Sequence, residues 1–303
     1  APLLLSQTRL PRRALPFPSV HTVRPSRFFI PHPSSHPRAM DLKPNDVKRR
    51  LRAGEVCFGT MLRILTSPKA VALCASEGWD YVILDTEHND YDPQTLGLFS
   101  LLAKYERMGL FVRIPDTVPH VMAQTLDYGA EGLVIPQVGS AAQARDIVRS
   151  TKYAPSGRRG VSQSATATRF RTHPVEDYTA WANSELLNIV QIESVEGVRQ
   201  VEEIVAVEGI DAVMMGPADL TMDMGIPGRF EDPGFAEACR KVIRACETHG
   251  VAPGIHVPDM AMAERWLSEG MRFLTYSYDS KLFKEASRDA LGALRQASEA
   301  GRT

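Results

Sequence analysis

Two carboxylates stand at comparable places in the chain, each just after a short apolar run. Glu193 follows Gln191-Ile192, and Asp219 follows Gly216-Pro217-Ala218. If both runs are neighbouring strands, the two side chains could share a hard divalent cation, with water and substrate filling the other positions. Such a site prefers Mg, Mn or Co, and the lack of nearby cysteines argues against structural zinc. The alternative is that each carboxylate only caps the helix or turn beside it.

A histidine and an arginine extend this candidate site. His88 ends a polar tetrapeptide and could act as a general base near neutral pH. Arg113 follows an apolar tripeptide, where a buried cation requires an anionic partner such as a bound carboxylate or enolate. The alternative partner is Asp85, Glu87 or Glu193. No lysine follows any expected strand, which argues against an aldolase that forms a Schiff base.

A repeating alternation of strand, turn and helix must position these residues. The expected helices include residues 68–77, 119–128, 141–150, 195–205, 235–248 and 259–269. The expected strands are residues 56–62, 81–86, 110–114, 132–137, 187–192, 212–215, 251–256 and 273–276. Eight such strands predict an α/β protein, a closed parallel (β/α)8 TIM barrel whose carboxyl strand ends converge on one mouth.

Composition favours one catalytic domain with a small-molecule partner. The 303 residues are 44% hydrophobic, which allows a substantial core, and we assign residues 40–303 to a single barrel. A net charge of −1 offers no general attraction to nucleic acid or to a membrane. The four cysteines lack zinc-finger spacing, and no apolar run reaches the length of about 18 residues that spans a bilayer.

Two segments fall outside the regular repeat. Residues 1–39 contain six arginines and no acid, and we interpret them as a disordered basic leader or an artefact. We expect a cytoplasmic protein, or a mitochondrial one if that leader is a transit peptide. The long connection at residues 152–183 is either a surface loop or part of an active site or subunit interface.

The ordered strand-end motifs resemble those of the HpcH/HpaI aldolase family. Its members include 4-hydroxy-2-oxoheptanedioate aldolase and 2-dehydro-3-deoxyglucarate aldolase, and their barrels are phosphoenolpyruvate/pyruvate-domain-like. The resemblance covers about residues 50–290. It rests on Ile83-Leu84-Asp85-Thr86-Glu87-His88, Val112-Arg113, Leu126-Asp127-Tyr128-Gly129-Ala130, Gly157-Arg158-Arg159-Gly160, Val190-Gln191-Ile192-Glu193 and Gly216-Pro217-Ala218-Asp219-Leu220.

This resemblance implies a class II aldolase that cleaves or forms a 4-hydroxy-2-oxo acid through a metal-stabilised enolate of pyruvate. Glu193 and Asp219 would hold the metal, and Arg113 would stabilise the enolate. His88 would be the base at the aldehyde-side hydroxyl, with Asp127 raising its basicity. The implied substrate-binding residues are Asp85, Gln191, Gly216, Ala218 and Asp219.

The resemblance also implies a homo-oligomer, a hexamer built from trimers. Residues 153–171 would complete a neighbour's site, and residues 89–91 and 166–170 would shape the aldehyde pocket. One alternative is a citrate-lyase or malyl-CoA type of lyase, whose CoA phosphates would need the basic residues between 158 and 171. The other is a non-catalytic barrel that binds an oxo acid, which would predict a broken set of polar residues.

Overall fold

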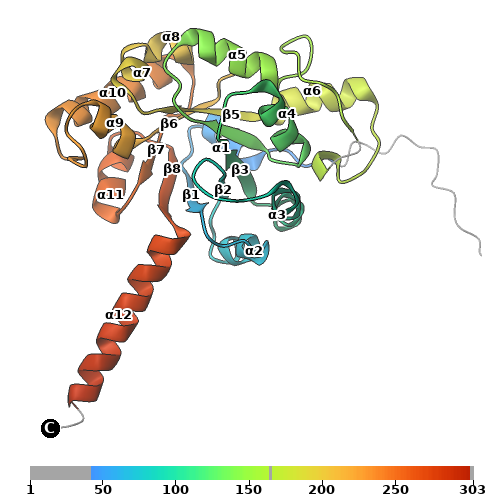
Figure 1. Cartoon of the computed structure of the whole chain (residues 1–303). Helices are drawn as coiled ribbons and strands as arrows, with labels where there is room; N and C mark the ends of the chain where they lie inside the picture. The colour runs from blue at the N-terminus through green and yellow to red at the C-terminus, as the bar shows by residue number, and fades with distance from the viewer. Residues whose placement is uncertain (1–41, 164–165, 301–303) are drawn as a thin grey trace, which may run out of the picture. The chain divides into compact units, whose positions relative to one another are not determined.

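Eight parallel strands close into a barrel in the order of the chain, with helices around them (Figure 1). The computed structural model describes residues 42–163 and 166–300, so the expected leader at residues 1–39 lies outside the described residues. The strands are β1 (Cys57–Leu62), β2 (Tyr81–Asp85), β3 (Gly109–Arg113), β4 (Gly132–Ile135), β5 (Leu187–Ile192), β6 (Ala212–Met215), β7 (Gly254–Val257) and β8 (Phe273–Tyr278). The predicted (β/α)8 fold is confirmed.

Aromatic side chains fill the interior of the barrel. Tyr81 on β2 stacks on Phe273 of β8 with 4.5 Å between ring centroids, and Phe111 of β3 packs against both rings. The buried phenol of Tyr81 is hydrogen-bonded to the hydroxyl of Thr275 at 3.0 Å. The interior is therefore a packed core, and the room for chemistry lies beyond the strand ends.

The surrounding helices pack on the outer faces of the strands. Several begin at an Asp or Ser whose side chain accepts a backbone N–H of the first turn, as Asp92, Ser140 and Asp259 do. Across the part of the chain that the structure describes, no helix is both long and apolar enough to cross a membrane. The helices are α1 (Asp46–Arg52), α2 (Lys69–Ser76), α3 (Pro93–Glu106), α4 (Pro119–Asp127), α5 (Ala141–Thr151), α6 (Val175–Glu185), α7 (Val195–Arg199), α8 (Val201–Val205), α9 (Pro217–Asp223), α10 (Pro233–His249) and α11 (Met260–Ser268).

The last helix, α12 (Asp279–Ala300), runs away from the barrel (Figure 1). Asp279 is its only buried residue and accepts the backbone N–H groups of residues 63–65, which ties the start of the helix to the end of β1. Further along, Phe283 and Leu294 are 72% and 68% exposed. A helix of 22 residues therefore carries large apolar side chains that its own barrel does not cover.

The largest differences from the expected boundaries are at the seventh strand and in the helix expected over residues 195–205, whereas several other strand ends differ by one or two residues. The seventh strand was expected from residue 251 but begins at Gly254, because Pro253 has no N–H to donate and Val251 is bonded to Cys246 at the end of α10. The single helix expected over residues 195–205 is interrupted at Gln200, whose backbone (φ −94°, ψ 11°) separates α7 from α8.

The long connection after α5 lies at the amino-terminal end of the barrel. It contains a short 3₁₀ turn, η1 (Thr166–Thr168), which packs against α3 and α4, and then α6, which leads into β5. Because α5 carries the chain back from the carboxyl ends of the strands, this connection starts and finishes at the opposite end from the mouth.

Candidate active site

Along each strand, alternate side chains point into the barrel, and at the carboxyl ends of β2, β3 and β5 these inward side chains are polar. Alternate residues of a strand share one face, so the residues below continue the rows that fill the aromatic core. The rows are Tyr81-Ile83-Asp85 on β2, Phe111-Arg113 on β3 and Ile189-Gln191-Glu193 on β5 and just past it. The structure therefore brings Asp85, Arg113, Gln191 and Glu193 to one mouth, as expected.

Two carboxylates hold the guanidinium of Arg113. Its Nε lies 2.9 Å from Asp85 Oδ1 and its Nη2 lies 2.7 Å from Asp85 Oδ2, while Nη1 lies 3.1 Å from Glu87. Asp85 is completely buried and Arg113 nearly so. Two of the three alternative partners expected for Arg113, Asp85 and Glu87, are thus present, and this two-sided clamp fixes the direction in which the guanidinium faces.

Asp85 also organises the loop that follows β2. Its carboxylate accepts the side-chain amide of Asn89 at 2.8 Å and the backbone N–H groups of Glu87 and His88, and it pairs with Arg63 at 3.3 Å. Burial by itself would raise the pKa of Asp85, but the hydrogen bonds and charge of Arg113 outweigh it and lower the pKa. Both oxygens of Asp85 are therefore engaged by groups of the protein itself.

Glu193 and Gln191 meet beside Gly216 at the end of β6. Glu193 Oε1 accepts the backbone N–H of Gln137 at 2.7 Å, and its Oε2 accepts the side-chain amide of Gln191. A Cβ on Gly216 would stand 2.6 Å from Glu193 Oε2 and 3.1 Å from Gln191 Nε2. Only glycine leaves room for this pair, because any other residue would place a Cβ against the Glu193 carboxylate.

Asp219 and Ala218 occupy the first turn of α9, directly after Gly216, and both are exposed to solvent. The charge of Asp219 acts on both Glu193 and Glu87, where it raises the pKa of each, so these three carboxylates share one electrostatic environment. The backbone N–H of Gly216 is bonded to Ile192 O at 3.1 Å, which ties the end of β6 to the end of β5.

The mouth carries more negative than positive charge. Burial, followed by the charges of Asp219 and Glu87, raises the pKa of Glu193 to about 7, although hydrogen bonds from Gln191 and Gln137 oppose that rise. Four carboxylates face two guanidinium groups: Asp85, Glu87, Glu193 and Asp219 against Arg63 and Arg113. A divalent cation would balance this excess before an anionic substrate arrives.

The donor atoms at the mouth suit a hard cation. Glu193 and Asp219 offer carboxylate oxygens, and the buried Gln191 Oε1 has no hydrogen-bond partner among the described residues. Within residues 42–163 and 166–300, no group of three or more His, Cys, Asp or Glu side chains forms a complete metal site. The residues therefore fit Mg or Mn only if water and substrate supply the remaining ligands.

His88 lies on the loop after β2. Its side chain is 53% exposed, and its Nε2 lies 3.7 Å from Glu87 Oε2. Its backbone N–H is turned toward Asp85 at 3.4 Å. The imidazole therefore sits at the rim of the mouth, where it can reach a substrate from the solvent side.

Asp127 is not brought to His88 within one chain. It is the last residue of α4 and accepts a hydrogen bond from Arg159 Nη2 at 2.7 Å. Because α4 returns from the mouth, its end lies at the amino-terminal end of the barrel, as does the segment at residues 166–170. Neither the expected contact with His88 nor an aldehyde pocket shaped by that segment is formed in the single chain.

Two residues of the mouth were missed by reasoning from the sequence. Arg63 follows β1, pairs with Asp85 and lies over the ring of Tyr278 at 4.9 Å. His256 on β7 is hydrogen-bonded to Ser277 O at 3.0 Å, and burial lowers its pKa to about 4. Both stand at or next to the end of an expected strand, the signal that identified Arg113, so both could have been found.

Comparisons of the sequence and of the fold with known proteins both identify aldolases of one family. A family model described as HpcH/HpaI aldolase/citrate lyase matches residues 61–286. A hydroxypyruvate/pyruvate aldolase of Pseudomonas aeruginosa is 37% identical over 258 residues, which cover 84% of this chain and 95% of the relative. A 4-hydroxy-2-oxo-heptane-1,7-dioate aldolase of Escherichia coli is 36% identical, covering 82% and 94%. The crystal structure of an HpcH/HpaI aldolase from Desulfitobacterium hafniense superposes with a TM-score of 0.79 at 35% identity, covering 82% and 96%.

Proposed function

The chain belongs to the HpcH/HpaI aldolase/citrate lyase family, whose named relatives are carbon–carbon lyases, and we propose that it is a divalent-metal-dependent pyruvate aldolase. Its substrate would be a 4-hydroxy-2-oxo acid, which it cleaves to pyruvate and an aldehyde or forms from them. The observation that carries this proposal is the mouth itself, where Glu193, Asp219 and Gln191 supply oxygen donors opposite the clamped Arg113.

The roles of the side chains follow from their positions. When bound, a divalent cation would act as a Lewis acid toward the 2-oxo group. Glu193 and Asp219 would hold that cation, and Gln191, itself bonded to Glu193, would fix the carboxylate's orientation. Arg113 faces the mouth as a permanent positive charge, which favours the negative charge that develops as the C3–C4 bond breaks.

Proton transfer is proposed for His88. In cleavage, its imidazole would take the proton from the C4 hydroxyl as that carbon becomes the aldehyde. Glu87 Oε2 lies 3.7 Å from Nε2 of this imidazole, on the same loop. In synthesis the same group would return the proton to the new alkoxide, so one residue serves both directions.

The CoA-dependent alternative has less support in this structure. Arg158, Arg159, Arg169 and Arg171, the basic residues that a CoA thioester would need, all belong to the connection at the amino-terminal end of the barrel. Arg159 is engaged with Asp127 and with the ring of Tyr153. A free-acid substrate therefore remains the proposal.

The experiment measures pyruvate release, coupled to lactate dehydrogenase, from a panel of 4-hydroxy-2-oxo acids. The enzyme is first treated with EDTA and then assayed with and without added Mn²⁺ or Mg²⁺. Release that depends on added metal supports the aldolase and ranks its substrates. Release that EDTA leaves unchanged contradicts metal dependence, and no release from any acid in either state contradicts the proposed reaction.

We also propose that the working enzyme is a homo-oligomer. Phe283 and Leu294 on α12 are large apolar residues that their own barrel leaves exposed, and a second copy would bury them. Replacing both with Ser should lower the mass measured by light scattering on a sizing column. A wild-type chain that elutes as a monomer at assay concentrations would overturn the proposal.

An oligomer is also the way in which Asp127 could act on His88, because one chain holds them at opposite ends of the barrel. The test mixes two inactive variants, His88→Ala and Asp127→Ala, after partial unfolding and reassembly. Recovered activity in the mixture, absent from either variant alone, would support a site shared between copies. No recovery, despite mixed oligomers shown by mass spectrometry, would contradict it.

A further inference from the structure

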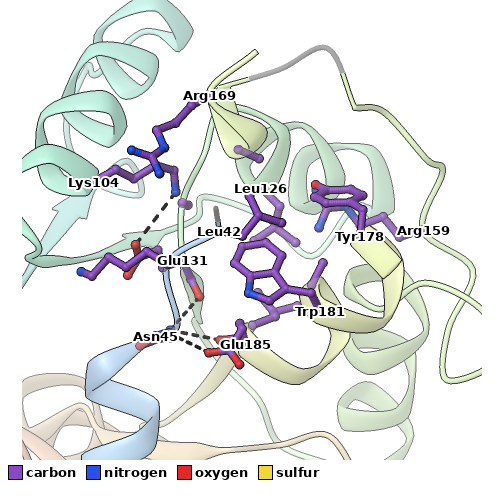
Figure 2. A pocket seen from close by; sticks show the side chains of 15 residues that line it. Leu42, Asn45, Lys104, Leu126, Glu131, Arg159, Arg169, Tyr178, Trp181 and Glu185 are labelled. Atoms are coloured by element: carbon purple, nitrogen blue, oxygen red, sulfur yellow. Dashed lines mark hydrogen bonds and ion pairs between the residues drawn. The ribbon is translucent and has the colours of Figure 1, made fainter. Parts of the chain in front are cut away.

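A second pocket lies at the amino-terminal end of the barrel, away from the mouth (Figure 2). It is enclosed by the start of the described chain, the ends of α3 and α4, η1 and α6. Its residues include Glu131, which immediately precedes β4, and Leu186, which precedes β5. Within one chain, this pocket therefore lies at the end of the barrel opposite the mouth.

One end of this pocket holds two buried charged groups, Lys104 and Glu131, that are too far apart to form a hydrogen bond with each other. Lys104 Nζ donates to Gly129 O at 3.0 Å but lies 3.9 Å from Glu131 Oε1. Glu131 Oε2 is buried and has no hydrogen-bond partner among the described residues. Both side chains are only 12% exposed, and burial raises the pKa of Glu131 and lowers that of Lys104. A ligand that offers a hydrogen-bond acceptor to Lys104 and a donor to Glu131 would therefore stabilise both buried groups.

The opposite wall of the pocket is apolar and already ordered. Figure 2 shows the side chains of Leu42, Leu126 and Trp181 gathered between the charged end and α6. The Trp181 ring stacks on the buried Tyr178 with 6.1 Å between centroids. At the floor, Asn45 donates its backbone N–H to Glu185 at 2.6 Å, so these two polar groups already have partners. An aromatic wall beside a few convergent polar groups is the usual composition of a small-molecule site.

We propose that this pocket binds a small hydrophobic carboxylic acid that carries a hydrogen-bond donor on the carbon next to its carboxylate. The carboxylate would lie on Lys104, the donor on Glu131 Oε2, and the hydrocarbon group against Trp181. Hydrophobic α-amino acids and α-hydroxy acids share this arrangement of groups. This inference does not rest on the proposed aldolase activity, because within one chain no residue of the pocket belongs to the mouth.

The test titrates the full chain with L-phenylalanine, L-phenyllactate and 3-phenylpropionate, which differ only in the donor beside the carboxylate. Binding is followed by calorimetry and by tryptophan fluorescence. L-phenylalanine or L-phenyllactate should bind at least about tenfold more tightly than 3-phenylpropionate, because 3-phenylpropionate has no donor for Glu131 Oε2. Trp181→Phe should remove most of the fluorescence response while calorimetric binding remains.

Two lysine variants separate this pocket from other sites. Lys104→Met should weaken binding by about tenfold or more, whereas Lys69→Met, at an exposed lysine on α2, should leave it unchanged. Glu131→Gln tests the donor separately and should abolish the preference over 3-phenylpropionate. Thermal melting checks that each variant folds. If Lys104→Met does not fold, Trp181→Ala replaces it and should also weaken binding.

Three results would overturn the proposal. The first is that none of the three probes binds the wild-type chain saturably. The second is that 3-phenylpropionate binds as tightly as the other two. The third is binding that persists in Lys104→Met and disappears in Arg113→Met, since that would assign the probes to the mouth.

Discussion

Gly216→Ala is the smallest substitution that should disable the mouth. A Cβ at this position would stand 2.6 Å from Glu193 Oε2 and 2.8 Å from Glu193 Cβ. Ordinary contact begins at 3.4 Å, so the carboxylate oxygen must move by about 0.8 Å, the difference between those two distances. The backbone of Gly216 (φ −101°) is one that alanine can adopt, so the effect arises from contact and not from strain.

The size of the effect follows from that displacement. Moving a group that orients the reaction by about 1 Å can lower the rate about 100-fold. We therefore expect kcat for pyruvate release to fall about 100-fold, and overpacking to lower the free energy of unfolding by about 1 to 3 kcal/mol. Coupled kinetics measure the first quantity and urea denaturation the second. Calorimetry with Mn²⁺ adds a readout that does not require turnover, and affinity should fall by about tenfold.

A matched control is available in the same chain. Gly292 of α12 has open space where a Cβ would be, its φ lies outside the left-handed region, and it is two residues from Leu294 and so on another side of the helix, so Gly292→Ala should leave kcat and Mn²⁺ affinity unchanged. If Gly216→Ala keeps the wild-type kcat and Mn²⁺ affinity, the position of Glu193 does not control the site and the reasoning fails.

Four further predictions address other parts of the molecule. Glu193→Gln removes a proposed metal ligand, so Mn²⁺ affinity by calorimetry should fall by about 10- to 100-fold, and unchanged affinity would rule the assignment out. Arg113→Met leaves the buried Asp85 carboxylate without its main partner, so urea denaturation should show a loss of about 3 to 5 kcal/mol; wild-type stability would be incompatible with the clamp. Burial holds the pKa of His256 at about 4, whereas an unfolded histidine binds a proton below about pH 6.5. The unfolded state thus binds more protons between these values and stability falls as the pH drops; His256→Asn should flatten that dependence, and an unaltered slope would refute it. Deleting residues 1–39 should leave the melting temperature unchanged, and a large drop would mean that the segment packs on the barrel.

Much of the barrel could be predicted because its signals are local. A strand buried on both faces is a short apolar run, and the turn and helix after it have their own composition. The same logic located the mouth, since a charged residue such as Arg113 or Glu193 at the end of an apolar run must find partners there. The family, too, could be identified from motifs of which most belong to these strand ends.

What could not be predicted depends on contacts between distant elements. Asp127 was grouped with His88 by resemblance, although it ends the helix that carries the chain back to the other end of the barrel. Helix direction was already visible in the sequence, and it would have separated the two residues within one chain. The pocket around Lys104 and Trp181 gave no motif at all, because it is assembled from five separate segments.

The central proposal is that this mouth, with a divalent metal, acts through the enolate of pyruvate, which in the direction of synthesis forms when the methyl group loses a proton that exchanges with solvent. Proton NMR of pyruvate in D₂O tests it without knowledge of the aldehyde. With Mg²⁺, the wild-type enzyme should replace the methyl protons by deuterium, EDTA should stop the exchange, and Glu193→Gln should slow it by about 100-fold or more. Exchange that continues at the same rate in EDTA, or no exchange above background with Mg²⁺ present, would contradict the account.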